Sequence, residues 1–195
     1  MDRTKTTRKP RNPQPQEWLA KDHSINYVAD YKPFNFVDGE GVRCSLYVSG
    51  CLFNCPGCYN KAAQSFHYGQ PYTQDLEDQI IKDMSQDYVQ GLTLLGGEPF
   101  LNTEVCLKLV RRIRAEFGHT KDIWSWTGYT WEEMMQESYD KLTLLSYLDI
   151  LVDGRFMQDK MDLTLQFRGS SNQRIIDVPK SLAQNKVVIW DKLVR

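Results

Sequence analysis

Three cysteines crowded into eight residues constrain this chain more than any other feature of its sequence. Cys51, Cys55 and Cys58 are separated by three and then by two residues. Cysteines this close together make a poor disulfide framework, and the residues before them contain no apolar export signal. In such a chain, clustering favours metal binding over disulfide formation. We therefore expect the three thiolates to be metal ligands on one loop.

The number of ligands separates two kinds of metal site. Three thiolates can bind three irons of a [4Fe–4S] cubane and leave the fourth iron open, whereas a closed zinc or electron-transfer site normally takes four protein ligands. The remaining cysteines, Cys44 and Cys106, lie on the apolar faces of a predicted strand and a predicted helix, so we expect both to be structural. His67 is the one plausible fourth donor. An open cluster is favoured, with a non-catalytic cluster or zinc module as an alternative.

Composition indicates one globular domain after a short tail. The chain has 195 residues, 41% of them hydrophobic and 25% charged, with a formal net charge of -1. No chain-wide positive charge favours nucleic acid, and no apolar stretch approaches the roughly 18 residues of a membrane helix. Residues 1–16 are basic and rich in proline, which predicts a disordered tail before a single domain at 17–195. We expect a cytoplasmic protein that binds neither nucleic acid nor membrane.

Short apolar runs alternate with helical patterns from Cys44 onward. Strands are predicted at Cys44–Ser49, Leu92–Leu95, Ile123–Trp126, Ile150–Val152, Ile175–Val178 and Val187–Trp190. Helices are predicted from Thr103 to a stop at Gly118, and at Asp75–Gln86 and Trp131–Leu148. The alternation predicts an α/β fold with about six mainly parallel strands, too few for a full eight-stranded barrel. The cysteine loop follows the first of these strands, at the carboxyl edge where parallel sheets place their sites.

The spacing of the three cysteines resembles that of the radical S-adenosylmethionine (SAM) superfamily. The turn Gly96-Gly97-Glu98-Pro99, which follows the next strand, is similar to the GGEP element of that superfamily. The resemblance implies a shortened partial (β/α) barrel, with one [4Fe–4S] cluster and SAM as cofactors. It also implies that the open iron binds the amino and carboxylate groups of SAM. Reductive cleavage then gives a 5′-deoxyadenosyl radical that abstracts hydrogen from a substrate.

Several residues are candidates for the cofactor site. Pro56-Gly57 would bend the loop around the cluster, and Tyr59 offers an aromatic face to an adenine. Two glycines allow close approach of a ligand to the backbone, and a glutamate there can compensate positive charge. The expected cofactor-binding residues are Gly57, Cys58, Tyr59, Gly96, Gly97, Glu98, Ser125 and Thr127. Cofactor contact, partner contact and a purely structural role all stay open for Asp153, Arg155, Arg168, Asn172 and Arg174.

Within the superfamily, the chain resembles the activating proteins of anaerobic ribonucleoside-triphosphate reductase. The stretches that carry this resemblance are Phe36–Cys51, Cys55–Asn60, Trp124–Tyr129 and Phe167–Arg174. The resemblance implies that the hydrogen donor is a glycine of the reductase, which becomes a glycyl radical. It also implies a low-potential electron donor such as flavodoxin. The alternative is a radical SAM enzyme that acts on a small molecule, such as a 7-carboxy-7-deazaguanine synthase.

Overall fold

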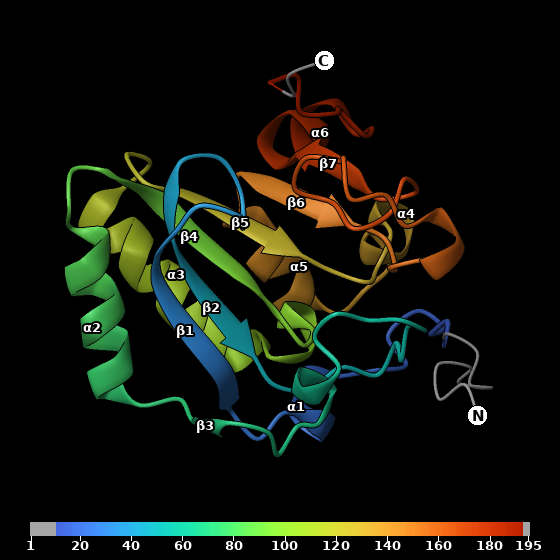
Figure 1. The fold of residues 1–195 in the computed structure, drawn as a ribbon, viewed down its shortest axis with the longest axis horizontal. Coiled ribbons are helices and arrows are strands. Elements are labelled where there is room, and N and C mark those ends of the chain that lie inside the picture. Colours follow the sequence, from blue (N-terminus) through green and yellow to red (C-terminus); the bar gives the residue numbers. More distant parts are fainter. Residues whose placement is uncertain (1–10, 193–195) are drawn as a thin grey trace.

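One mixed seven-stranded sheet organises residues 11–192, which the computed structural model describes (Figure 1). The strand order is β3-β1-β2-β4-β5-β6-β7. The strands are β1 (Tyr27–Asn35), β2 (Val42–Val48), β3 (Gln70–Pro71), β4 (Val89–Gly96), β5 (Asp122–Trp126), β6 (Ile150–Asp153) and β7 (Arg174–Asp177).

The four central strands, β2, β4, β5 and β6, run parallel to one another. They are the most apolar and most buried segments of the sheet, as expected for parallel strands joined by helical crossovers. The outer strands β1, β3 and β7 pair in the antiparallel sense. The predicted α/β fold with parallel core strands is confirmed, although the sheet has seven strands rather than about six, and its outer pairings are antiparallel.

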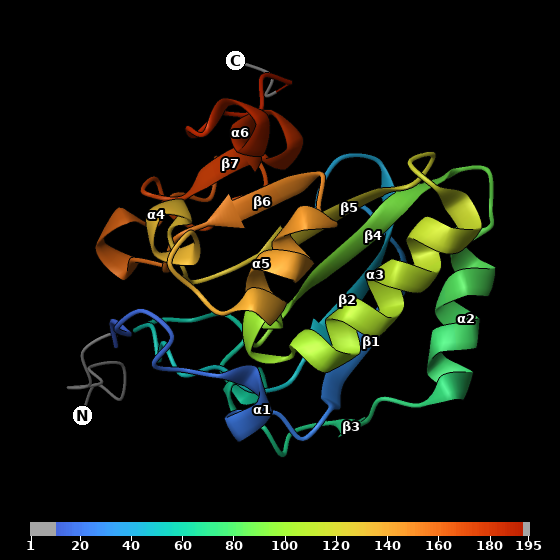
Figure 2. The same ribbon diagram turned by 180° about the vertical axis from the view of Figure 1, so that it is seen from behind.

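Helices cover one face of this sheet (Figure 2). The three longer ones on that face are α2 (Gln74–Met84), α3 (Thr103–Phe117) and α5 (Tyr139–Ser146). The shorter elements are α1 (Ala20–His23), α4 (Trp131–Met134), α6 (Val178–Gln184) and the 3-10 turns η1 (Ala62–Gln64), η2 (Pro99–Leu101) and η3 (Gln158–Lys160). Cys44 and Cys106 are fully buried in the core between sheet and helices, which confirms their structural role.

Two of the predictions of secondary structure were wrong. The helix expected at Trp131–Leu148 is broken into α4 and α5, because Ser138 has extended backbone and begins a new helix. The strand expected at Val187–Trp190 is reduced to one isolated bridge, between Ile176 and Ile189. The chain pairs with β7 there at one position only, so no strand forms.

The ends of the sheet also differ from the predicted pattern. Strand β1 was missed because most of its residues are half-buried or exposed and Pro33 interrupts its pattern, as is common on outer strands. Helix α6 starts at Val178, which was assigned to the preceding strand. The Asp177 side chain caps that helix by accepting from Lys180 N, and Pro179 lies in its first turn.

The predicted tail lies mostly outside the described residues, which begin at Arg11. From there to Gln16 the chain runs against the domain: Arg11 N donates to Phe53 O at 3.0 Å. Across residues 11–192, every helix is too short or too polar to cross a membrane.

Candidate functional site

A hollow of about 130 Å³ lies at the carboxyl ends of the central parallel strands. In Figure 1 the teal loop that follows β2 lies at this edge, beyond the arrowheads of β2 and β4. All three loop cysteines line the hollow. Further wall residues come from the turns after β4 and β5 and from the approach to β7; they include Gly96, Gly97, Glu98, Trp126, Thr127 and Gln173. The topology thus brings together residues far apart in the chain.

The cysteine loop is held by its own backbone. Gly50 N donates to Ala63 O at 2.7 Å, which ties the start of the loop to the turn after it. Cys58 N donates to Cys55 O at 3.2 Å and closes a tight turn. Within that turn Gly57 has φ +71°, a left-handed conformation that favours glycine. The sharp bend predicted at Pro56-Gly57 is present.

The three loop cysteines are partly buried. Burial raises the pKa of Cys51 well above its usual value, and the neighbouring Glu98 charge raises it further. Burial, followed by the Cys58 charge, raises the pKa of Cys55 to about 11. Thiolate is the form that binds metal, so these groups need cationic iron to become ligands. A bound cation would lower these two pKa values again and favour the thiolate form.

The Gly-Gly turn after β4 is joined to the start of the cysteine loop. Gly97 N donates to Val48 O at 2.7 Å, and Glu98 N donates to Gly50 O at 2.8 Å. A β-carbon on Gly97 would lie 2.5 Å from Gly50 O and 2.8 Å from Ala63 O. We expected this glycine to make room for a ligand, but the backbone that approaches it most closely belongs to the protein itself.

Glu98 joins the turns after β4 and β5. Its carboxylate is 1% exposed and accepts hydrogen bonds from Phe100 N, Thr127 Oγ1 and Gly128 N at 2.8–3.1 Å. Burial raises its pKa to about 7, against the opposing effect of these donors and of the Lys141 charge. A carboxylate has about four acceptor positions, so the protein already uses most of them.

Comparisons with known proteins agree with this geometry. Residues 37–176 match the family described as a 4Fe-4S single cluster domain. The anaerobic ribonucleoside-triphosphate reductase-activating protein of Pasteurella multocida is 46% identical over 155 residues, which cover 77% of this chain and 96% of the relative. This chain belongs to that activating-protein family. The Escherichia coli K12 protein of the same name is 47% identical over 153 residues (76% and 96%), and that of Enterobacteria phage T4 is 40% identical over 153 residues (77% and 93%).

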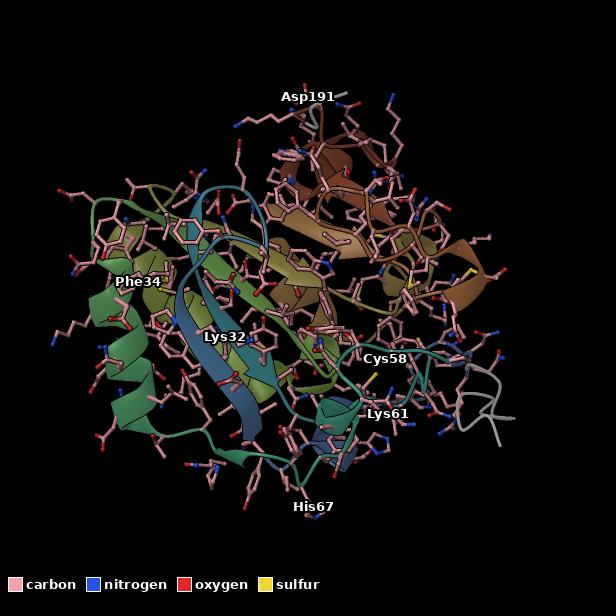
Figure 3. All side chains as sticks on the ribbon, viewed as in Figure 1. Lys32, Phe34, Cys58, Lys61, His67 and Asp191 are labelled. Atoms are coloured by element: carbon pink, nitrogen blue, oxygen red, sulfur yellow. The ribbon has the colours of Figure 1, made fainter. Side chains whose placement is uncertain are left out.

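The cysteines around the hollow fit the cofactors of this family, which are one [4Fe–4S] cluster and SAM. All five cysteines are free, and three of them share the hollow. Within residues 11–192, no three His, Cys, Asp or Glu side chains converge on a single metal ion. In a cubane each thiolate binds its own iron, so the three sulfur atoms are expected to lie farther apart than the ligands of a single metal ion. His67 is exposed at the edge of the molecule, away from Cys58 (Figure 3).

Some of the other residues predicted to bind the cofactor line the hollow, and others do not. Thr127 and Gly96 line it, whereas Ser125 is fully buried and its hydroxyl donates to Trp126 O at 3.3 Å. Tyr59 is fully exposed and is not among the wall residues. The aromatic wall residue on β5 is Trp126, to which sequence analysis gave no role. Strand alternation from the buried Ile123 could have placed its side chain on the face opposite the helices.

Ion pairs connect the ends of β6 and β7 to helix α4. Arg174 pairs with Asp153 and Glu132. Arg155 makes a two-pronged pair with Glu133 at 2.9 and 3.0 Å. These pairs give both arginines structural partners, and neither residue is among those that line the hollow.

The segment before β7 closes one side of the hollow through a residue that sequence analysis missed. Gln173 lines it, donating to Gly154 O at 3.0 Å and accepting from Gly169 N at 2.9 Å. Its neighbours in the motif bond to nearby backbone: Asn172 Nδ2 donates to Arg155 O at 2.9 Å, and Arg168 Nη1 donates to Gln173 O at 3.3 Å. The signal for Gln173 in the sequence was its place inside the stretch Phe167–Arg174, between Asn172 and Arg174.

Proposed function

We propose that this chain activates an anaerobic ribonucleoside-triphosphate reductase by forming a glycyl radical on it. One observation carries the proposal: the cysteine loop, the Gly-Gly-Glu turn and the turn after β5 meet around one hollow. In that hollow, Cys51, Cys55 and Cys58 bind the cluster and leave one iron for SAM. When bound, these cofactors supply a radical by one-electron reduction of SAM, and that radical takes a hydrogen atom from the partner's glycine.

The chain's own residues bind and orient the cofactors and keep out water. Glu98 fixes the positions of Thr127 and Gly128, so the two turns that line the hollow keep one relative geometry. Phe53, which is 1% exposed, and Trp126 supply apolar walls. In a dry site the charges that develop during the reaction interact more strongly than in water.

The loops around the hollow support a protein as the hydrogen donor. Helices cover only one face, and the loop between β6 and β7 lies beside the cysteine loop, with Gln158 next to Gly57. Both loops carry exposed apolar side chains: Tyr59 on the cysteine loop is 100% exposed, and Met161 and Leu163 on the loop between β6 and β7 are 54% and 90% exposed. Exposed apolar side chains on neighbouring loops can serve as contacts for a protein partner. We propose that the reductase segment enters here.

The proposal includes a low-potential electron donor of the flavodoxin type and a reducing compartment, the cytoplasm. The cluster must be reduced before SAM can be cleaved, and the free thiols of residues 11–192 suit reducing conditions.

Isotope transfer tests the proposal. The protein is incubated anaerobically with reductant, SAM and a reductase deuterated at its C-terminal glycine. Deuterium should appear in 5′-deoxyadenosine, and paramagnetic resonance should show a glycyl doublet that is lost when that glycine is replaced by alanine. Cys55→Ala should abolish both signals, while Cys106→Ala, a buried cysteine outside the hollow, should keep them.

Two results would contradict the proposal. One is a radical that persists on the reductase without its glycine. The other is deuterium transfer from a small molecule with no reductase present, which would favour a small-molecule radical SAM enzyme.

A further inference from the structure

We propose that residues 11–18, the N-terminal strap, hold the cysteine loop in its binding geometry, and that Trp18 is the main positioning residue. Trp18 acts through Phe53, which lies between Cys51 and Cys55 in the chain. The proposal rests on those cysteines being cluster ligands, as proposed above. It gives part of a segment predicted to be a tail a role in the site.

The strap is bonded to the middle of the cysteine loop. Arg11 N donates to Phe53 O at 3.0 Å, and Arg155 Nε donates to Arg11 O at 3.2 Å. The Arg155 guanidinium also lies over the Phe53 ring, 4.7 Å from its centroid. Backbone and ring of Phe53 are therefore held from outside by two different parts of the chain.

Aromatic packing makes the second connection. Trp18 is 2% exposed, and its ring meets the ring of Phe53 edge to face, with centroids 5.1 Å apart. Tyr129 completes the group at 4.9 Å from Phe53 and 6.4 Å from Trp18. Within residues 11–192 the indole N–H of Trp18 has no hydrogen-bond partner. Packing against Phe53, Tyr129 and the Arg11 guanidinium, 5.0 Å from the Trp18 ring centroid, therefore decides where this ring lies.

A buried lysine anchors the end of the strap. Lys141 Nζ donates to Trp18 O at 2.6 Å, to Tyr129 Oη at 2.9 Å and to Glu137 Oε2 at 2.8 Å, and its side chain is fully buried. An ammonium group has three donors, and all three are used. A buried charge whose partners are fixed tolerates little displacement, so Trp18 is held in one place.

Phe53 transmits this position to the cofactor hollow. A β-carbon on Gly128 would lie 2.4 Å from Phe53 Cδ2, so the phenyl ring packs directly on the Gly128 backbone. The N–H of that glycine donates to Glu98 Oε2. One continuous set of contacts thus runs from the strap through the cysteine loop to the Gly-Gly-Glu turn. Removing Trp18 leaves Phe53 unsupported on that side and frees the loop between Cys51 and Cys55.

The test compares loop opening and cluster loss in matched variants of the full chain. Trp18→Ala removes the packing, and Trp18→Phe keeps an aromatic edge for Phe53. Ile113→Ala is the control, because Ile113 is fully buried in α3, away from the cysteine loop. A second pair deletes residues 1–12, which removes the Arg11 bonds, or residues 1–9, which keeps them. Of the described residues this pair removes only Arg11 and Asn12, both exposed, so it remains informative if Trp18→Ala does not fold.

Two readouts separate positioning from general stability. Amide hydrogen exchange of residues 50–60 in the cluster-free protein should be about tenfold faster or more in Trp18→Ala, because a large buried contact is lost beside this loop. Cluster loss to a chelator should accelerate in the same variant and in the 1–12 deletion. Trp18→Phe, the 1–9 deletion and Ile113→Ala should keep loop exchange near that of the unaltered protein.

Equal acceleration in Ile113→Ala and Trp18→Ala would overturn the proposal, as would unchanged exchange in both Trp18→Ala and the 1–12 deletion. Because exchange is measured without cofactors, its result is independent of activity toward the reductase. A failure of the strap proposal is therefore distinguishable from a failure of the proposed function.

Discussion

Replacing Gly97 by alanine tests how closely the Gly-Gly turn is joined to the cysteine loop. The new β-carbon would lie 2.5 Å from Gly50 O and 2.8 Å from Ala63 O. Both atoms are backbone and cannot rotate away, so the turn itself must move. That movement weakens the bonds from Gly97 N to Val48 O and from Glu98 N to Gly50 O.

The magnitude follows from these contacts. Two hydrogen bonds contribute about 1 kcal/mol each, and overpacking of a tight site costs about 1–3 kcal/mol more. We therefore expect Gly97→Ala to lower the free energy of unfolding by roughly 3–5 kcal/mol, a large part of the stability of a typical domain. SAM affinity should fall as well, because the turn lines the hollow.

Denaturant unfolding of the cluster-free protein, followed by tryptophan fluorescence, measures this loss. Gly118→Ala is the control for backbone strain without crowding: Gly118 has a positive φ, +56°, which Gly97 does not have, and no atom lies within 4 Å of its added β-carbon. The control should lose about 1–3 kcal/mol from backbone conformation alone. If Gly97→Ala were no less stable than Gly118→Ala, the close packing of the two turns would not be what requires glycine.

Four further predictions concern the same site. Alanine at any of the three loop cysteines should abolish cluster binding and SAM cleavage, measured by iron content and product analysis, while Cys44→Ala and Cys106→Ala retain both with reduced stability. Air should remove the open iron, so a cluster spectrum unchanged after long exposure would argue for a fourth protein ligand. The buried Glu98 has its pKa raised from 4.5 to about 7, so the cluster-free protein should lose stability as the pH rises through that range, and Glu98→Gln should flatten this dependence in denaturant titrations. Trp126→Ala should weaken SAM binding in equilibrium dialysis more than Tyr59→Ala, because Trp126 lines the hollow and Tyr59 does not.

The parallel strands were predictable because their signals are local. The strands now labelled β2, β4, β5 and β6 are apolar runs, and the stop of α3 at Gly118 follows from that residue's own conformational freedom. What failed depended on distant partners. The break between α4 and α5 accompanies a buried pair of Glu137 and Lys141, whose ammonium group also binds a carbonyl more than 120 residues away.

The sequence by itself determined the chemistry of the site, because three cysteines at that spacing lie on one loop whatever surrounds them. It also placed them after a parallel strand, and therefore at the carboxyl edge of the sheet. Only the tertiary structure decided which other groups meet there. Trp126 lines the hollow while Tyr59 points to solvent, and Trp18 packs behind the cysteine loop. Such contacts join residues far apart in the chain, and the packing of the whole sheet and its helices sets them rather than any local pattern.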